Sequence, residues 1–147
     1  MTGGCGTDVD SVDRPEIDFC IVGAQKSGTT ALYRFLQRQE PIYLPETKEI
    51  HYFARDEFHR RGDDYLDQYY RAREDEERAG MAYVHLLYFA HESARRICEY
   101  NPEMRILAVL RDPVDRAYSA YWFARRNGWE DIRTFADALD AEEERAR

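Results

Sequence analysis

Apolar runs alternate with amphipathic segments along the chain, and this alternation predicts its secondary structure. Continuous apolar runs predict strands at 17–22, 81–89 and 105–110, with a short extended piece between two prolines at 41–45. Apolar residues at helical spacing predict helices at 28–39, 63–75, 90–100, 113–127 and from 134 onward. Strands separated by helices indicate an α/β fold with three layers, in which helices flank a central, mostly parallel sheet.

Two segments are predicted to lie outside this regular pattern. Residues 1–14 are polar and rich in glycine, so we expect a disordered tail before a single domain at 15–147. The segment 46–62 is mostly polar and predicts a loop. The run at 105–110 is the clearest apolar one and predicts a central strand of the sheet.

The composition favours a small enzyme without a membrane segment. The chain has 147 residues, 44% of them hydrophobic, which allows one domain with a core. No apolar run is long enough to span a bilayer, and the N-terminus has no basic and apolar leader, so we expect a cytoplasmic protein. The net charge of −8 argues against a nucleic-acid binder. The three cysteines form no CxxC pair, which argues against a zinc site and a disulfide framework.

The most informative motif is the sequence GAQKSGTT at 23–30, which joins the first predicted strand to the first predicted helix. A glycine-rich turn in this place directs backbone N–H groups and a helix N-terminus at an anion. The loop is P-loop-like, but Lys26 precedes Gly28 and no magnesium-binding aspartate is evident after the later strand. We therefore predict a phosphate-type site without a metal. Its candidate binding residues are Gly23, Lys26, Ser27, Gly28, Thr29 and Thr30.

Lysine is rare in this chain, and its two positions carry information. Of the 21 basic residues only Lys26 and Lys48 are lysines, so both are candidates for sites that need a compact ammonium group. The alternative is a general preference for arginine over lysine, in which the two remaining lysines occur by chance. The Lys26 loop and Arg111 both follow predicted strands, so they can face one ligand at the carboxyl edge of the sheet.

Three segments together resemble one enzyme family. Residues 23–32 resemble the 5′-phosphosulfate loop of sulfotransferases, which use 3′-phosphoadenosine 5′-phosphosulfate (PAPS). Residues 110–119 (LRDPVDRAYS) resemble the 3′-phosphate-binding segment of these enzymes. Residues 48–53 (KEIHYF) resemble the segment between them in the bacterial and heparan-sulfate-type branch. The resemblance implies that 15–147 is the N-terminal part of a sulfotransferase domain.

The resemblance also implies a reaction and a set of residue roles. The reaction is transfer of a sulfuryl group from PAPS to a hydroxyl or amine, without a metal. Lys26 would stabilise the charge on the leaving group. Arg111 and Ser119 would hold the 3′-phosphate. Glu49 would be the general base, and Lys48 would contact the transferring group.

Two features depart from the family pattern. Residues 80–85 lack the acidic residue and the proline that relatives often carry. Ala82 stands where the heparan-sulfate branch has a further functional lysine, so that role does not carry over. The chain is also shorter than family members, and we therefore expect a form truncated at the C-terminus. His51 is the second candidate for the base.

Several alternatives remain open from the sequence alone. One is a noncatalytic nucleotide-binding domain that binds adenosine 3′,5′-bisphosphate. Another is a small-molecule kinase of the P-loop type, whose ligand binding would depend on Mg²⁺. The acceptor is a carbohydrate, a lipid, a small alcohol or an amine, and the oligomeric state is open.

Overall fold

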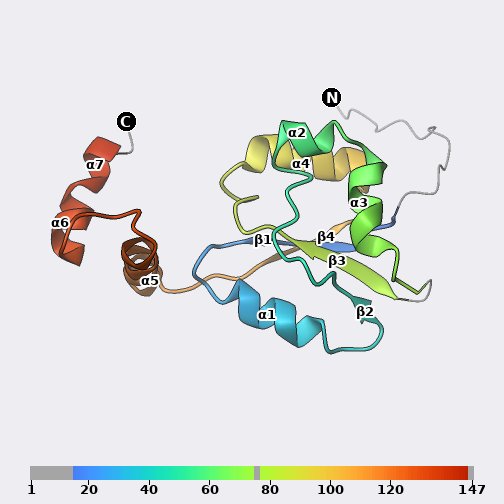
Figure 1. Ribbon diagram of the computed structural model, residues 1–147, viewed down its shortest axis with the longest axis horizontal. Helices are drawn as coiled ribbons and strands as arrows, with labels where there is room; N and C mark the ends of the chain where they lie inside the picture. The colour runs from blue at the N-terminus through green and yellow to red at the C-terminus, as the bar shows by residue number, and fades with distance from the viewer. Residues whose placement is uncertain (1–14, 75–76, 146–147) are drawn as a thin grey trace, which may run out of the picture.

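The computed structural model describes residues 15–74 and 77–145, so the predicted tail at 1–14 lies outside the described residues. Its strands are β1 (Phe19–Gly23), β2 (Ile42–Tyr43), β3 (Arg78–Ala82) and β4 (Arg105–Ala108). They form one parallel sheet in the order β2-β3-β1-β4 (Figure 1). The predicted parallel sheet is therefore confirmed.

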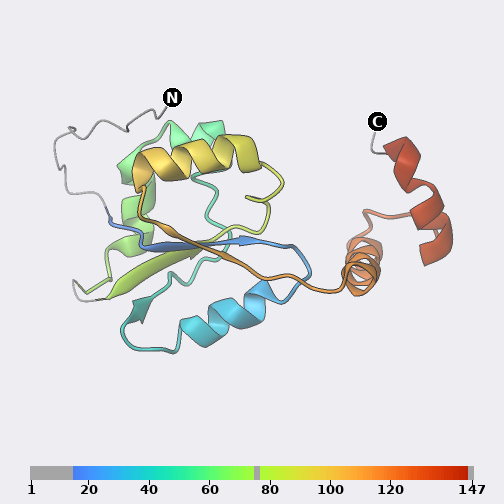
Figure 2. The same ribbon diagram turned by 180° about the vertical axis from the view of Figure 1, so that it is seen from behind.

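Helices lie on both faces of the sheet, as Figures 1 and 2 show from opposite sides. One face carries α1 (Thr29–Leu36), and the other carries α2 (Asp56–His59), α3 (Asp63–Tyr70) and α4 (Ala90–Tyr100). The last helices are α5 (Pro113–Arg126), α6 (Phe135–Asp140) and α7 (Glu142–Arg145). They form a helical lobe that lies apart from the sheet, beyond the carboxyl ends of the strands (Figure 1). The predicted α/β architecture is thus confirmed.

β1 is the centre of the core, and all five of its residues are buried. Successive side chains of a strand point to opposite faces. Cys20 and Val22 pack in the larger core cluster, to which α3 and α4 contribute. Phe19 and Ile21 pack in the smaller cluster with Tyr33 of α1. A strand covered on both faces explains why this segment reads as a continuous apolar run.

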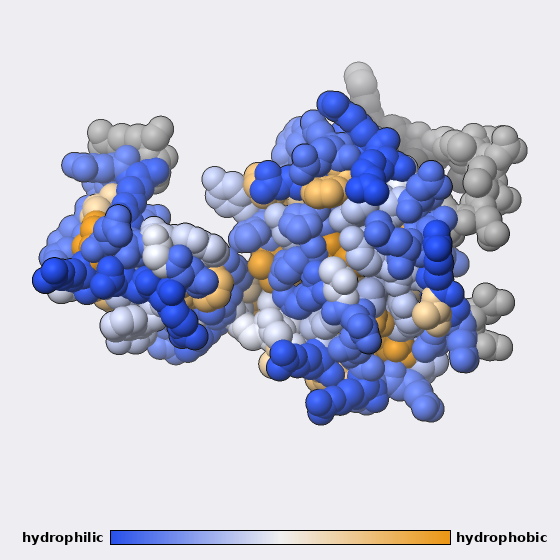
Figure 3. All heavy atoms as spheres, in the orientation of Figure 1, coloured by the Kyte–Doolittle hydropathy of each residue, from blue (hydrophilic) through white to orange (hydrophobic). Residues whose placement is uncertain are grey.

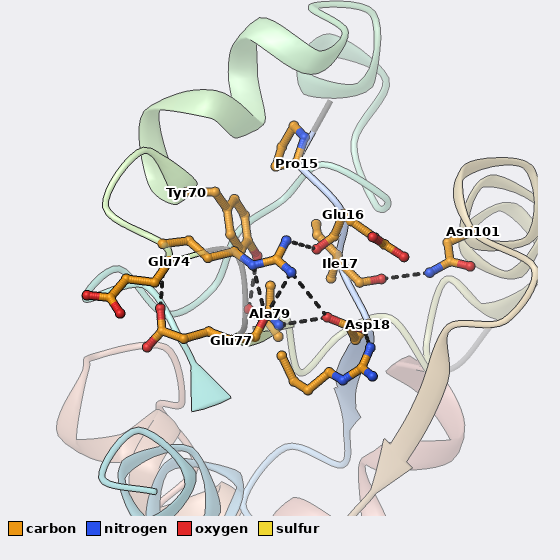
Figure 4. Close-up of polar contacts among 12 residues, drawn as sticks. Pro15, Glu16, Ile17, Asp18, Tyr70, Glu74, Glu77, Ala79 and Asn101 are labelled. Atoms are coloured by element: carbon orange, nitrogen blue, oxygen red, sulfur yellow. Dashed lines mark hydrogen bonds and ion pairs between the residues drawn. The ribbon is translucent and has the colours of Figure 1, made fainter. Parts of the chain in front are cut away.

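A polar network holds the amino end of the sheet (Figure 4). Asp18 accepts hydrogen bonds from the Ala79 N–H and from Arg78 Nη1, each at 2.8 Å. Asn101 Nδ2 donates to the Ile17 carbonyl at 3.0 Å. These contacts tie the start of β1 to β3 and to the end of α4. They help to fix the register of the strands at the end of the sheet opposite the helical lobe.

β3 lies earlier in the chain than the predicted strand at 81–89. Gly80 packs directly under the Phe19 ring, where an added Cβ would lie 2.1 Å from a ring atom. A strand built of small residues therefore fits beside β1, although its sequence is less apolar. The residues after β3 form turns, and the Leu87 N–H donates to the Val22 carbonyl at 3.2 Å. The apolar residues in this stretch cover the carboxyl end of β1 rather than forming a strand.

β4 is an edge strand, so the prediction of a central strand at 105–110 was wrong. It pairs with β1 on one side, and no strand in the described part of the chain pairs with its other side. All four residues are exposed, and Ile106 is 52% exposed. The reason is that α5 lies in the helical lobe and not over β4 (Figure 1). Hydrophobic side chains such as Val114 are also exposed on the lobe, within a largely hydrophilic surface (Figure 3).

Candidate active site

A pocket of about 360 Å³ opens where the loop after β1 meets the helical lobe. Four segments that are far apart in the sequence line it: the loop and first turn of α1, residues 48–49, Val84, and the middle of α5. The lining residues are Gln25, Lys26, Gly28, Thr29, Thr30, Lys48, Glu49, Val84, Ser119 and Phe123. The structure therefore brings most of the residues singled out from the sequence to one cavity.

Gly23 allows the chain to turn from β1 into the loop. Its φ is +148°, and a Cβ at this position would lie 2.9 Å from the Val84 carbonyl oxygen. The next residue, Ala24, donates its N–H to the Val109 carbonyl at 2.9 Å, and the Val109 N–H donates to the Gly23 carbonyl at 2.7 Å. These bonds hold the loop against the segment that follows β4. They place the loop beside the segment that leads into α5.

The N-terminus of α1 faces the pocket without a side-chain cap. The N-cap residue Gly28 has φ +101° and provides no side-chain hydrogen bond to the first turn. The N–H groups of a first helical turn have no partner within the helix. Thr29 is buried and Thr30 is exposed, and both line the pocket. Of the loop residues predicted for the site, Gly23 and Ser27 do not line the pocket; Ser27 Oγ is buried and has no hydrogen-bond partner among the described residues. This end of the pocket therefore offers N–H and O–H donors to an anion.

Lys26 connects the loop to the helical lobe at two points. Its ammonium nitrogen lies over the Phe123 ring, 4.3 Å from the ring centroid. Its carbonyl oxygen accepts a hydrogen bond from Arg111 Nη1 at 3.4 Å. Phe123 belongs to α5, and Arg111 lies just before this helix. Lys26 thus contacts Arg111 of the predicted 3′-phosphate segment and Phe123, which lies further along α5.

Glu49 is held in the pocket by its side chain and by the chain after it. One carboxylate oxygen, Oε1, pairs with the Lys48 ammonium. The other, Oε2, accepts a hydrogen bond from the Val84 N–H at 3.1 Å. The following residue, Ile50, donates its N–H to the Ala82 carbonyl at 3.2 Å. The carboxylate is therefore oriented by the end of β3 and remains 37% exposed.

Lys26 and Glu49 share an unusual backbone conformation. Their φ angles are +66° and +60°, and no other non-glycine residue in the described ranges has a positive φ. A residue with a side chain in this region costs of order 1–3 kcal/mol, and such residues cluster at functional sites. The coincidence of both in one pocket marks this cavity as the candidate active site.

Ser119 and Arg111 belong to the segment that starts α5. Asp112 caps this helix by accepting from the Val114 N–H at 3.0 Å, and Pro113 occupies its first position, at the start of the helix predicted for 113–127. Ser119 lines the pocket from the second turn of α5. Arg111 does not line it, and its guanidinium lies 3.8 Å from the Asp115 carboxylate.

His51 lies outside the pocket lining and packs among aromatic rings. Its ring centroid is 4.5 Å from that of Tyr83 and 5.5 Å from that of Phe58. Burial, with a smaller contribution from the nearby Arg55, lowers the pKa of His51 below its ordinary value. This environment is that of a packing residue.

Three residues that line the pocket were not among the candidates from the sequence: Gln25, Val84 and Phe123. Phe123 follows Ser119 by four positions, so helical spacing alone places both on one face of α5. That signal was available. Val84 donates its backbone N–H to Glu49, and a backbone contact of this kind cannot be predicted from the pattern of side chains.

The cysteines and possible metal ligands of the described residues add no further site. Cys20 is buried, which raises the pKa of its thiol, and Cys98 is exposed. Within residues 15–74 and 77–145, no three His, Cys, Asp or Glu side chains are grouped so that they could hold a metal ion. None of the helices in these ranges has the length and apolar character that crossing a membrane requires.

Comparison with known proteins identifies relatives of the chain. A family model described as the sulfotransferase domain matches residues 16–145. Human bifunctional heparan sulfate N-deacetylase/N-sulfotransferase 3 is 34% identical over 118 residues, which are 77% of this chain and 13% of that protein. The mouse N-deacetylase/N-sulfotransferase 4 is 33% identical over 118 residues. The chain thus spans 13% of the length of these curated relatives.

A solved structure agrees with the sequence matches. The crystal structure of a sulfotransferase from Alicyclobacillus acidocaldarius superposes with a TM-score of 0.77 and is 35% identical in sequence. The match covers 90% of this chain and 59% of that one. Because sequence and fold point the same way, and the family model covers most of the residues, this chain belongs to the sulfotransferase domain family.

Proposed function

We propose that this chain transfers a sulfuryl group from PAPS to a hydroxyl or amine acceptor. The observation that carries the proposal is the joint presence of Lys26, Glu49 and Ser119 in one pocket. They supply a cation, a carboxylate and a hydroxyl from three separate segments. PAPS, when bound, supplies the sulfuryl group on a phosphate that is already a good leaving group. The protein then has to bind the anionic donor and to receive the proton of the acceptor.

The loop end of the pocket suits a phosphosulfate group. The N–H groups at the start of α1 and the hydroxyls of Thr29 and Thr30 are donors, and Lys26 adds a positive charge. Ser27 Oγ also lacks a partner within the described residues, but it is buried and Ser27 does not line the pocket. Lys26 would stabilise the negative charge that grows on the bridging oxygen. Preorganised groups of this kind typically contribute about 10²–10³ in rate.

Arg111 and Ser119 suit the 3′-phosphate of the donor. Arginine presents a planar fork of N–H groups, and serine adds one hydroxyl donor. In the free protein the Arg111 guanidinium lies near Asp115, and both side chains are well exposed. An exposed pair of this type is worth about 0–1 kcal/mol. A phosphate group can therefore replace Asp115 as the partner of Arg111 at little cost.

Glu49 would act as the general base. The Val84 N–H fixes Oε2, so Oε1 is the atom that would receive the acceptor proton. Oε1 must first leave Lys48, and this pair is partly buried, with side-chain exposures of 18% for Lys48 and 37% for Glu49. General-base catalysis typically contributes about 10²–10⁴ in rate. Lys48 would then be free to contact the transferring group.

The relatives point to the chemical class of the acceptor. The human and mouse proteins are named as heparan sulfate N-sulfotransferases. We therefore propose a carbohydrate that carries a free hydroxyl or amine as the acceptor. A lipid or a small alcohol is the alternative that the sequence left open.

A titration with adenosine 3′,5′-bisphosphate tests the donor site. Calorimetry without added metal is expected to give micromolar binding by the unmodified chain. Arg111→Ala should abolish this binding, because the variant removes the main 3′-phosphate contact. Arg126→Ala is the matched control, since this arginine lies exposed at the end of α5, and it should bind like the parent.

Other outcomes of this titration favour the competing functions. Binding that requires Mg²⁺ would support the kinase alternative. Metal-independent binding without any turnover of PAPS across a panel of carbohydrate acceptors would support a noncatalytic nucleotide-binding domain. A folded protein that binds nothing would contradict the proposal.

A further inference from the structure

The pocket holds two ammonium groups, and each has a different partner. Lys48 pairs with Glu49, the single carboxylate among the lining residues. The Lys26 ammonium instead lies 4.3 Å from the centroid of the Phe123 ring. An ammonium over the face of an aromatic ring is attracted by the negative charge of that face. Among the residues that the structure describes, Lys26 thus forms no ion pair, although the Glu49 carboxylate lines the same cavity.

The Phe123 ring is supported by the turn that ends α5. Gly128 has φ +72°, and the Trp129 N–H donates to the Ala124 carbonyl at 2.9 Å. This turn brings the Trp129 ring edge-on to Phe123, with centroids 5.5 Å apart and an interplanar angle of 76°. The phenyl ring is therefore packed against the indole as well as against the ammonium.

Lys26 itself cannot relocate freely. Its backbone is fixed at φ +66°, and its carbonyl accepts a hydrogen bond from Arg111 Nη1 at 3.4 Å. With the backbone held in this way, the position of the ammonium depends on the contacts of the Lys26 side chain. In the free protein the ammonium contacts the Phe123 ring.

We infer that Phe123 is a positioning residue for Lys26. Its ring holds the ammonium on the α5 side of the pocket and apart from Glu49. Lys26 then remains available for an anionic donor, and Glu49 remains available for the acceptor. The roles of Lys26 towards the donor and of Glu49 towards the acceptor rest on the proposed sulfuryl transfer. Without the ring, Lys26 competes with Lys48 for the carboxylate.

The two lysines make a direct test practical. A sample labelled with ¹³C at the ε-carbon of lysine gives only two side-chain signals, and Lys48→Arg assigns them. In the ligand-free protein, the ε-protons of Lys26 should be shifted upfield by the Phe123 ring current and should show nuclear Overhauser contacts to ring protons. Phe123→Leu should abolish the shift, whereas Phe123→Tyr should retain it. Trp122→Leu is the matched control on the same helix, since no contact of Trp122 with Lys26 is present.

Functional measurements on the same variants complete the test. Phe123→Leu is expected to lower kcat and to weaken binding of adenosine 3′,5′-bisphosphate, each about two- to fivefold, the range of a partly exposed cation–π contact. Phe123→Tyr should restore both values.

The spectra and the functional measurements can each contradict the inference independently of the other. An unshifted Lys26 signal, without Overhauser contacts in the unmodified protein, overturns the inference whatever the enzyme does. A shift that disappears in Phe123→Leu while kcat and affinity stay unchanged overturns the positioning role. Absence of bisphosphate binding by the unmodified chain refutes the proposed function, and the spectra then still decide whether Phe123 holds Lys26.

Discussion

Lys26 and Glu49 are residues at which side-chain chemistry and backbone strain coincide. Glycine is the residue that a left-handed conformation favours, yet both positions carry long charged side chains. The sequence identified both residues through their motifs, but it gave no sign of their φ angles. Loop conformation depends on hydrogen bonds to distant segments, such as that from Arg111 to Lys26, and these are not local in the sequence.

The positive φ at Lys26 predicts that substitutions at this position can differ in stability while all of them abolish activity. Lys26→Gly and Lys26→Ala should both abolish sulfuryl transfer, because both remove the ammonium. Lys26→Gly should raise the free energy of unfolding by about 1 kcal/mol relative to Lys26→Ala, since only glycine adopts φ +66° without a steric cost. Denaturant unfolding of the two variants measures the difference. Equal stabilities would mean that the loop relaxes, and retained turnover would remove Lys26 from the mechanism.

Glu49→Gln tests the base without changing the shape of the side chain. The amide oxygen of glutamine can still accept from the Val84 N–H, so the pocket should keep its form. Turnover should fall by about 10²–10⁴, whereas binding of adenosine 3′,5′-bisphosphate should persist. Glu46→Gln removes the same charge from an exposed position three residues earlier and serves as the control. Loss of nucleotide binding in Glu49→Gln would make this residue structural.

Among the elements, those with strong local signals could be predicted from the sequence. The apolar run at 17–22 predicted β1, and apolar residues at helical spacing predicted α5 within 113–127. The wrong predictions concern elements whose structure depends on contacts with segments that are distant in the sequence. The predicted loop at 46–62 contains α2, and β3 was displaced because Gly80 must fit under a ring of β1. Neither effect has a local signature.

The segment around α2 predicts a pH dependence of stability. Burial is the main cause that lowers the pKa values of His51 and His59, and nearby arginines add to it. The folded state therefore binds protons less readily than the unfolded state. The free energy of unfolding should be highest above pH ~6.5 and should decline as the pH falls through the lowered pKa values.

Substitution separates these histidines from the background. His59→Gln should flatten the decline in stability below pH ~6.5, as measured by thermal unfolding across a pH series. His91→Gln is the control, since the side chain of His91 is 97% exposed. If both variants follow the parent, the half-buried His59 does not control acid stability.

For the whole molecule, the topology explains why the site could be located from the sequence. Loops after parallel strands meet at one edge, so the Lys26 loop and the α5 segment had to approach each other. What could not be foreseen is that the α5 helix leaves the sheet. This departure places the helical lobe against Lys26 through Phe123 and uncovers β4.

The uncovered edge of β4 predicts self-association. An exposed apolar edge strand offers unpaired backbone groups to another chain. Sedimentation velocity over a concentration series should show larger species at high protein concentration. Ile106→Lys should shift the distribution towards the monomer, because it places a charge on the edge. Phe35→Lys, a change at a similarly exposed residue of α1, should not. A parent protein that stays monomeric throughout would contradict this prediction.

The scarcity of lysine also gives the pocket a chemical consequence. Its two lysines carry the only ε-amines of the 147 residues, and both line the cavity. A reagent that acylates primary amines therefore modifies no side chain outside it. The rate at which mass is added to these two residues, followed by peptide mass spectrometry, reads the occupancy of the pocket directly. Acylation of the two lysines can therefore detect binding of ligands that have not yet been identified.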